Sequence, residues 1–247
     1  MKETHSRARL LDELRGLSIL LMVVHHAAWD LHHLFGVAVP LLQHPVVTAL
    51  QGLFAGVFVV ISGMVCHASR NNLRRGLQVL ACGMAVTAVT LLALPEKAVW
   101  FGILHLLGTS ILLYALGQKL WRRIPPLAGA AAALIGFSAA WGLPHGFLSF
   151  GPMHLFLPDG AYRLPWGFVV GLPAPNFRSG DYFPLLPWGF LFFFGAFLGR
   201  PVFQHRRPQW LFPARYPMLA QVGRHSLWVY LLHQPVLYGL MTLLFQP

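Results

Sequence analysis

Residues 12–33 read D-E-L-R-G-L-S-I-L-L-M-V-V-H-H-A-A-W-D-L-H-H and predict the first membrane-spanning helix of an all-helical protein. Arg15 lies eleven residues before His26, which is close to three turns of an α-helix and about 16 Å along its axis. Asp30 and His33 follow His26 by four and seven residues on the same stripe. Ionisable side chains are costly inside a bilayer, so this stripe predicts a functional site. The alternative is that its two ends lie in water at opposite interfaces.

The composition indicates one integral membrane unit. Of the 247 residues, 56% are hydrophobic and 10% are charged, with a mean hydropathy of +0.60, whereas a soluble domain has about 25% charged residues. The formal net charge of +11 would suggest nucleic acid in a soluble protein. Here the basic residues form short clusters between apolar runs, so membrane topology explains them and no nucleic acid partner is predicted. We therefore predict a single integral membrane domain over residues 1–247, surrounded by a lipid bilayer.

Seven apolar runs are long enough to cross a hydrocarbon core about 30 Å thick. The predicted spans are residues 14–34, 45–66, 76–94, 100–118, 125–143, 183–199 and 224–245. Segments placed outside carry only Lys97, Arg163 and Arg178, and the other fifteen of the 18 lysines and arginines lie in segments placed inside. This distribution follows the positive-inside rule and predicts a cytoplasmic N-terminus and an outside C-terminus. The outer segment 144–182 is rich in proline and aromatic residues, and its stretch 164–172 either dips back into the membrane or lies at the interface.

Further polar side chains recur in the later spans or beside them. They are His105 in F-G-I-L-H-L-L-G, Asp181 in S-G-D-Y-F-P-L-L-P-W, and both Ser226 and His233 in G-R-H-S-L-W-V-Y-L-L-H-Q-P. Ser226 and His233 are seven residues apart and share a helix face. Each of these groups alone is as compatible with a polar contact between helices as with catalysis. Together with the first-span stripe, they predict one polar cavity.

A histidine with a carboxylate one helical turn away is suited to general base catalysis. In the predicted pair, Asp30 holds the tautomer of His26 and stabilises its imidazolium. The sequence has no G-x-S-x-G elbow, no P-loop and no G-x-G-x-x-G motif. Serine-esterase chemistry, nucleotide hydrolysis and dinucleotide redox chemistry are therefore not indicated.

The motifs R-L-L-D-E-L-R-G-L-S-I-L-L-M-V-V-H-H, F-G-I-L-H-L-L-G, D-Y-F-P-L-L-P-W and G-R-H-S-L-W-V-Y-L-L-H-Q-P, in this order, resemble the bacterial branch of the heparan-alpha-glucosaminide N-acetyltransferase family. The spacing of Arg15 and His26 also resembles that of the membrane acyltransferase-3 proteins. The resemblance implies a multi-pass enzyme of the bacterial inner (plasma) membrane. Such an enzyme moves an acyl group, usually acetyl, from cytoplasmic acetyl-CoA to an amine or hydroxyl of an extracytoplasmic saccharide or glycolipid.

The same resemblance implies roles for single residues in catalysis and acceptor binding. We place the catalytic histidine of the family on His26, and we predict Asp30 and His233 as its catalytic partners. Asp181 and His105 match motif positions, and with Ser226 they form the predicted acceptor-binding set. The residues leave open whether transfer is direct or passes through an acetyl-histidine.

The donor, acetyl-CoA, carries several negative charges and comes from the cytoplasm. Arg15, Arg70 and Arg74 lie at predicted inner ends of spans and are the predicted contacts of its phosphates. Ordinary positive-inside topology also explains Arg70 and Arg74, whereas Arg15 lies on the stripe of the predicted base. No metal is expected, and the sequence is compatible with a homodimer.

Two other functions are compatible with these features. Thirteen histidines suggest a haem or metal protein, in which one pair on a helix face, either His25 and His32 or His26 and His33, combines with His105 and His233. A proton-coupled transporter or flippase for a lipid-linked saccharide would also use intramembrane His and Asp side chains. The sequence shows no inverted repeat, which argues against the transporter.

Overall fold

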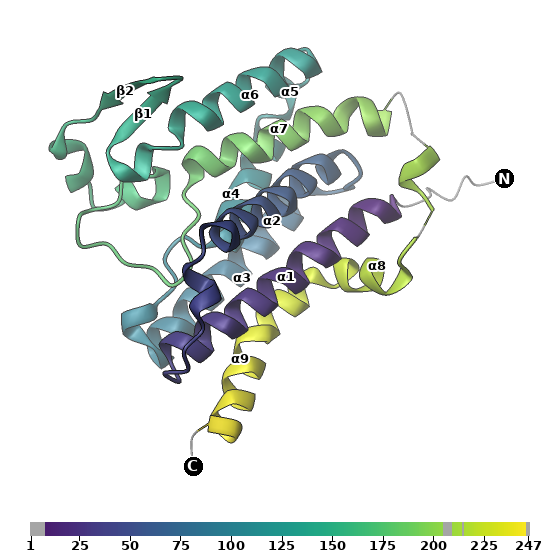
Figure 1. Cartoon of the computed structure of the whole chain (residues 1–247). Coiled ribbons are helices and arrows are strands. Elements are labelled where there is room, and N and C mark those ends of the chain that lie inside the picture. The colour runs from purple at the N-terminus through teal and green to yellow at the C-terminus, as the bar shows by residue number, and fades with distance from the viewer. Residues whose placement is uncertain (1–7, 205–208, 214, 246–247) are drawn as a thin grey trace. The chain divides into compact units, whose positions relative to one another are not determined.

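The computed structural model describes residues 8–204, 209–213 and 215–245 (Figure 1). The chain divides into two compact units, each considered by itself here. Unit 1 comprises Met1–Phe58 and Arg207–Pro247, and unit 2 comprises Val59–Arg206. The helices are α1 (Arg9–His33), α2 (Pro45–Met64), α3 (Asn72–Ala93), α4 (Ile103–Leu116), α5 (Gln118–Trp121), α6 (Pro126–Ala140), α7 (Leu185–Gln204), α8 (Pro217–Arg224) and α9 (Ser226–Phe245).

Most of the described residues are helical, and many of the helices suit a membrane. Five stretches are long and apolar enough to cross a bilayer: Pro45–His67, Asn72–Ala93, Pro126–His145, Leu185–Phe203 and Ser226–Phe245. Each overlaps a predicted span. The all-α membrane-helix fold is therefore confirmed. Helix α4 is apolar but has only 14 residues, and α1 has 25 residues but carries charged side chains. The count of seven spans and the side of each terminus stay predictions.

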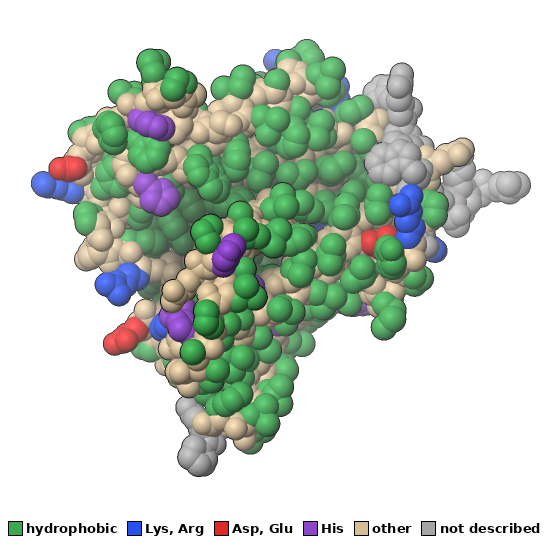
Figure 2. Space-filling view, in the orientation of Figure 1, with side chains coloured by type: hydrophobic (Ala, Val, Ile, Leu, Met, Phe, Trp, Pro, Cys, Tyr) green, Lys and Arg blue, Asp and Glu red, His purple; other side chains and the backbone are tan. Residues whose placement is uncertain are grey.

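The outer surface of these helices is apolar. Figure 2 shows hydrophobic side chains over most of the visible face, with few charged side chains among them. Leucines such as Leu92 on α3 and Leu243 on α9 are more than four-fifths exposed. In water such a surface would be unfavourable, whereas apolar lipid tails accept apolar side chains.

In unit 1, α1 packs against α8 and α9. Helix α8 contacts the first turns of α1 through small residues. A Cβ atom on Gly16 would overlap the carbonyl oxygen of Leu219, and one on Gly223 would overlap the carbonyl oxygen of Asp12. The two backbones therefore touch, which is typical of helix pairs in membranes. Helix α9 contacts the second half of α1 and places His233 beside His26 of the histidine stripe.

In unit 2, α7 packs against α6, α4 and the short 3₁₀ turn Val65–His67 that follows α2. Glycines again permit the close approach, because a Cβ on Gly195 of α7 would overlap the carbonyl oxygen of Val60. Helices α3 and α4 form the other extensive pair, in which Gly108 of α4 faces the backbone of Leu80. The contact between α3 and α4 positions the start of α4, where the polar residues His105 and Asp181 of unit 2 lie.

The predicted irregular segment 144–182 contains a small antiparallel hairpin that the sequence did not reveal. Strand β1 (Phe147–Phe150) pairs with β2 (Met153–Phe156), with Phe147 opposite Phe156. A 3₁₀ turn follows at Gly167–Val170, inside the stretch predicted to dip or to lie at the interface. The hydroxyl of Tyr182 donates to the carbonyl of Phe168 at 2.7 Å. Burial raises the pKa of Tyr182, which keeps its phenol protonated.

Candidate active site

The histidine stripe of α1 meets α9 in unit 1. The Nδ1 atom of His26 lies 2.8 Å from the Nε2 atom of His233, and the two rings are stacked with centroids 5.0 Å apart. The Nδ1 atom of His233 lies 2.6 Å from the carbonyl oxygen of Tyr230. Two of the three predicted catalytic residues are thus brought together, although 207 positions separate them in the sequence.

These contacts assign the tautomers of the two neutral rings. A carbonyl oxygen only accepts hydrogen bonds, so the Nδ1 of His233 carries the hydrogen and its Nε2 is an acceptor. The Nδ1 of His26 must then donate to that Nε2. The remaining nitrogen of His26, Nε2, keeps its lone pair and has no hydrogen-bond partner among the described residues. An imidazole in this state can accept a proton or attack a carbonyl carbon.

Asp30 lies one turn after His26 on α1 and is fully buried. Both of its carboxylate oxygens lie 3.1 Å from the Nε2 of Gln234, the residue that follows His233 on α9. The other side-chain atom of Gln234, Oε1, is buried without a hydrogen-bond partner among the described residues. Gln234 was not among the predicted site residues, although its place directly after His233 in H-Q-P is a signal that could have suggested it.

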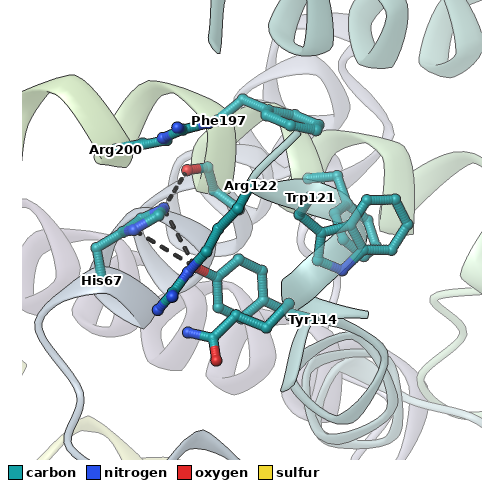
Figure 3. A pocket seen from close by; sticks show the side chains of 9 residues that line it. His67, Tyr114, Trp121, Arg122, Phe197 and Arg200 are labelled. Atoms are coloured by element: carbon teal, nitrogen blue, oxygen red, sulfur yellow. Dashed lines mark hydrogen bonds between the residues drawn. The ribbon is translucent and has the colours of Figure 1, made fainter. Parts of the chain in front are cut away.

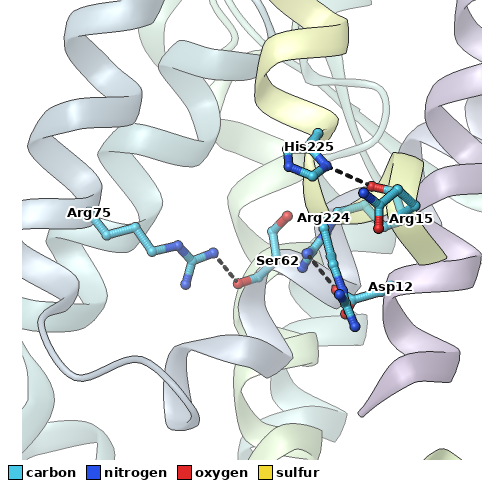
Figure 4. Close-up of polar contacts among 7 residues, drawn as sticks. Asp12, Arg15, Ser62, Arg75, Arg224 and His225 are labelled. Atoms are coloured by element: carbon cyan, nitrogen blue, oxygen red, sulfur yellow. Dashed lines mark hydrogen bonds and ion pairs between the residues drawn. The ribbon is translucent and has the colours of Figure 1, made fainter. Parts of the chain in front are cut away.

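Arg15 lies on the first turns of α1, at the other end of the stripe. Its Nη1 atom is 3.5 Å from Asp12 Oδ1, and its side chain is only 13% exposed (Figure 4). The Nε atom of Arg224, the last residue of α8, lies 3.9 Å from the other oxygen of the same carboxylate. Two guanidinium groups thus lie beside one carboxylate at this end of the stripe.

A second carboxylate on α1 anchors the chain before α8. One side-chain oxygen of Glu13 accepts hydrogen bonds from the backbone N–H groups of Arg215 and Tyr216, at 2.7 and 2.9 Å. Glu13 is buried, and these bonds satisfy it. Glu13 was not among the predicted site residues, because an acidic residue at the start of a span is usually exposed at the membrane interface.

Ser226 is the first residue of α9 and is buried. It lies two turns before His233 on the same helix, so the two share a face as predicted. The structure therefore places Ser226 in unit 1 with the histidine pair. Its role in acceptor binding stays a proposal.

Asp181 lies in unit 2, where it caps α4. Its Oδ2 atom accepts a hydrogen bond from the backbone N–H of Ile103 at 3.0 Å, and it packs against the Cα of Gly102. The first N–H groups of a helix have no partner inside the helix, and a carboxylate there is stabilised by the helix dipole. This cap orders the junction between the outer segment and α4.

Replacing Asp181 tests the cap. Asp181→Ala removes the acceptor of the Ile103 N–H and is expected to destabilise the protein by about 1 kcal/mol. Asp181→Asn keeps a side-chain oxygen and is expected to lose much less. Thermal unfolding of the detergent-purified variants measures the difference. An equal loss of stability in both variants would show that the charge, rather than the hydrogen bond, holds the helix end.

His105 follows on α4 and is buried against α3. Its Nε2 atom lies 3.2 Å from the Oγ1 of Thr87, whose hydroxyl donates to the carbonyl of Val99 at 2.7 Å. The hydroxyl oxygen is thus the acceptor of the His105 N–H, and the ring also contacts Gly83. These contacts join α3 to α4, and they place His105 near the helix end that Asp181 caps.

The other predicted donor contacts, Arg70 and Arg74, lie in unit 2 at the start of α3. Both are exposed, and the backbone N–H of Arg74 is capped by Asn71. The neighbouring Arg75 instead points to the end of α2, where its Nη2 lies 3.4 Å from the carbonyl oxygen of Ser62 (Figure 4). Exposed arginines at a helix start are available to an anion, but they also satisfy the positive-inside rule.

Among the described residues, the histidines form no metal centre with other ligands. Within the part of the chain that the structure describes, no group of three or more His, Cys, Asp or Glu side chains is arranged to hold a metal ion. His32 and His33 of the first span lie instead against the carbonyl oxygens of Val37 and Trp29.

Comparison with known protein families assigns the chain. The sequence model of the family described as "Heparan-alpha-glucosaminide N-acetyltransferase, catalytic" matches residues 7–235. The match begins before α1 and ends just after His233 and Gln234, so it includes the whole candidate site. Searches of curated proteins and of solved structures found no match. The chain therefore belongs to the heparan-alpha-glucosaminide N-acetyltransferase family and is a membrane acetyltransferase.

Proposed function

We propose that this protein transfers an acetyl group from cytoplasmic acetyl-CoA to an amine or hydroxyl of an extracytoplasmic saccharide, with His26 as the catalytic base. The observation that carries this proposal is the 2.8 Å contact between His26 and His233, which leaves a lone pair on the Nε2 of His26. We also propose that it works in the bacterial inner membrane, as one membrane domain. The family assignment supports acetyl transfer in general, and the residues below support the finer assignments.

The reaction forms one bond and breaks another. Acetyl-CoA supplies the acetyl group as a thioester. The Nε2 of His26 accepts the proton of the acceptor N–H or O–H while that nitrogen or oxygen bonds to the thioester carbonyl carbon. The carbon–sulfur bond then breaks, and His26 returns the proton to the departing thiolate sulfur. In the relayed variant, Nε2 attacks the thioester carbonyl carbon, the carbon–sulfur bond breaks and the CoA thiolate leaves, so that Nε2 carries the acetyl group. The acceptor nitrogen or oxygen then bonds to the acetyl carbon, the bond to Nε2 breaks, and the proton of the acceptor passes to the thiolate.

His233 and Asp30 support the imidazolium that His26 becomes in the direct reaction. The acceptor nitrogen of His233 lies on the Nδ1–H of His26, and a hydrogen bond of this kind strengthens when the donor is charged. Asp30 adds a buried carboxylate one helical turn away. The orienting contact is thus assigned to His233, and Asp30 acts through its charge.

Gln234 is a candidate contact for the acceptor. Its amide N–H₂ group is held by Asp30, which fixes the orientation of the amide, so that Oε1 is the atom left without a partner among the described residues. A buried acceptor atom costs free energy unless a donor reaches it. The N–H or O–H of a saccharide would satisfy it beside the catalytic histidine. Ser226, Asp181 and His105 stay proposed contacts of the same acceptor.

The donor is expected to enter from the Arg15 end of α1. Arg15 and Arg224 bring two guanidinium groups to this end of α1, and guanidinium groups match phosphate oxygens in geometry. Arg15 lies about 16 Å along the helix from His26, so an extended donor is needed to connect the two. Arg70 and Arg74 are proposed as further phosphate contacts, supported only by their exposure and charge.

Sealed vesicles test the proposed sidedness. Inside-out membrane vesicles that contain the protein are loaded with glucosamine as a probe amine, and acetyl-CoA is added outside. We expect acetylated glucosamine inside the vesicles and free CoA thiol outside. Transport of unmodified glucosamine without thiol release would support the transporter and reject the acetyltransferase. Transfer only when donor and acceptor share one compartment would reject the transmembrane route.

Arg15 has a separate prediction. Arg15→Gln is expected to raise the KM for acetyl-CoA about ten- to a hundredfold, because a charge-assisted contact to phosphate is lost, while kcat changes less. The fold should survive, since Asp12 keeps Arg224 as a partner. Arg9→Gln is the control, because Arg9 is exposed on the first turn of the same helix. Equal KM values in both variants would exclude Arg15 from the donor site.

A further inference from the structure

A pocket in unit 2 is lined by none of the residues assigned so far. It is formed where α4, α5 and α7 meet the 3₁₀ turn after α2 (Figure 3). Its lining residues are His67, Tyr114, Gln118, Trp121, Arg122, Phe193, Ala196, Phe197 and Arg200. The free space is about 290 Å³, including volume that is open to the surroundings.

The floor of the pocket is held by His67. Its Nε2 atom lies 2.8 Å from the carbonyl oxygen of Ala196, so this nitrogen carries the hydrogen. The hydroxyl of Tyr114 lies 3.3 Å from the same Nε2 and 3.4 Å from the other ring nitrogen, Nδ1, which has no hydrogen and can accept from it. Tyr114 is buried, and its ring meets the His67 ring edge-on. Both nitrogens of His67 are therefore engaged, and His67 and Tyr114 form a rigid floor.

Two arginines provide the charge of the pocket. Figure 3 shows Arg122 and Arg200 extending toward the His67 side of the pocket. Arg200 uses one nitrogen, Nη1, to donate to the carbonyl of Ile124 at 3.1 Å. A guanidinium has five N–H donors, so most of the donors of this pair are left for a ligand.

Among the described residues, no carboxylate lines the pocket. Between residues 59 and 206 the sequence has only three acidic residues, Glu96, Asp159 and Asp181, and all three lie in segments that the positive-inside pattern assigns to the outer side. The pattern assigns Arg122 and Arg200 to the cytoplasmic side. Topology alone explains basic residues at this level, but it does not explain two guanidinium groups that line one pocket with aromatic walls.

We propose that this pocket binds a phosphate group of an amphiphilic or nucleotide ligand at the cytoplasmic side. Guanidinium pairs match phosphate oxygens in geometry and charge. Trp121, Phe193 and Phe197 provide apolar walls beside them, which suit a flat base or an acyl chain. Two sources carry this chemistry: the phosphates of the acetyl donor and the headgroup of an anionic phospholipid. Only the first source rests on the proposed function, which it extends by a donor contact distinct from Arg15.

The test compares two neighbouring arginines. Arg122→Gln removes a guanidinium that lines the pocket, whereas Arg123→Gln removes the adjacent positive charge, which does not line it. The detergent-purified full chain is titrated with CoA in one arm and with phosphatidylglycerol against phosphatidylcholine in the other, and thermal stabilisation gives the affinities. Arg200→Gln serves as a second pocket variant. All variants are first compared without ligand, so that loss of folding is separated from loss of binding.

We expect at least about tenfold weaker binding of one phosphate ligand in Arg122→Gln and Arg200→Gln, with Arg123→Gln close to wild type. A loss confined to CoA assigns the pocket to the donor, and a loss confined to phosphatidylglycerol assigns it to a lipid. Equal affinities in all variants, or equal losses in Arg122→Gln and Arg123→Gln, would overturn the site. The vesicle assay is independent, because absent acetyl transfer with pocket-dependent phosphate binding would reject only the proposed function.

Discussion

Replacing His26 with alanine is expected to lower acetyl transfer by about 10²- to 10⁴-fold, the usual contribution of a general base. The reason lies in the hydrogen bonds of the pair. His233 donates its Nδ1–H to the Tyr230 carbonyl, and its Nε2 accepts a hydrogen bond from His26. The one ring nitrogen of the two histidines that keeps a free lone pair is therefore the Nε2 of His26. The measurement is the rate of CoA thiol release from acetyl-CoA in the presence of glucosamine, with protein quantity and thermal stability checked in parallel.

His25→Ala is the matched control. His25 is the preceding residue of the same helix, and its ring lies 6.1 Å from that of His26 without a hydrogen bond to it. Its loss removes an equal volume from α1 and should leave the rate within about threefold of wild type, as for surface substitutions that change the free energy by about 0.5 kcal/mol. Full activity of His26→Ala, or an equal loss in both variants, would exclude His26 as the base.

Isotope labelling separates the two chemical routes. If the acetyl group rests on His26, incubation with labelled acetyl-CoA and no acceptor should leave label on the protein, and His26→Ala should abolish that label. If transfer is direct, the wild type should stay unlabelled while turning over normally with acceptor. Either result is compatible with the hydrogen-bond arrangement, because both routes use the same lone pair.

Replacing Gly223 with alanine is expected to have the largest effect on stability. A Cβ at this position would overlap the backbone carbonyl oxygen of Asp12, and a backbone atom cannot move aside as the end of a flexible side chain can. Overpacking of this kind costs about 1–3 kcal/mol and occasionally more, and here we expect at least about 3 kcal/mol because main chain meets main chain. The separation of α8 from α1 should also weaken the Arg224–Asp12 contact.

Gly239→Ala is the control for this prediction. Gly239 lies on α9 in the same unit, and a Cβ there meets nothing within 4 Å. Alanine favours a helix over glycine by about 1 kcal/mol, so this variant should be unchanged or slightly more stable. Thermal unfolding in detergent, followed by size-exclusion chromatography, gives the comparison. Similar unfolding temperatures for Gly223→Ala and Gly239→Ala would show that α8 does not pack closely on α1.

Much of the fold could be predicted from the sequence because a bilayer imposes a simple rule. Apolar runs of about 20 residues form helices in lipid, and the runs near residues 45, 76, 125, 183 and 224 all do so. The hairpin Phe147–Phe156 was not predicted, because its strands are short and its pattern is dominated by proline and aromatic residues around it. Strand pairing there depends on contacts with α6, which no local pattern contains.

The ionisable residues of the candidate site could be predicted from the sequence, because burying an ionisable group in a membrane is costly. His26, Asp30 and His233 stood out because each is an ionisable group in an apolar run. The role of Gln234 could not be found in that way, since a glutamine carries no charge. Nor could the phosphate pocket, because Arg122 and Arg200 follow the ordinary topology rule and come together only through the packing of α5 and α7.

The sequence by itself determined that this chain is a helical membrane protein of an acetyltransferase family, with ionisable groups on one stripe of its first span. The tertiary structure decided which groups meet. Helical spacing pairs His26 with Asp30 on α1, but α9 supplies a closer partner to each. Successive residues of a helix point about 100° apart, so His233 reaches the imidazole while Gln234 reaches the carboxylate. Because the hydrogen bond of His233 engages only the Nδ1 of His26, the lone pair on Nε2 is left to accept a proton or to attack a carbonyl carbon. This arrangement depends on a contact between residues 207 positions apart, which no local sequence pattern contains.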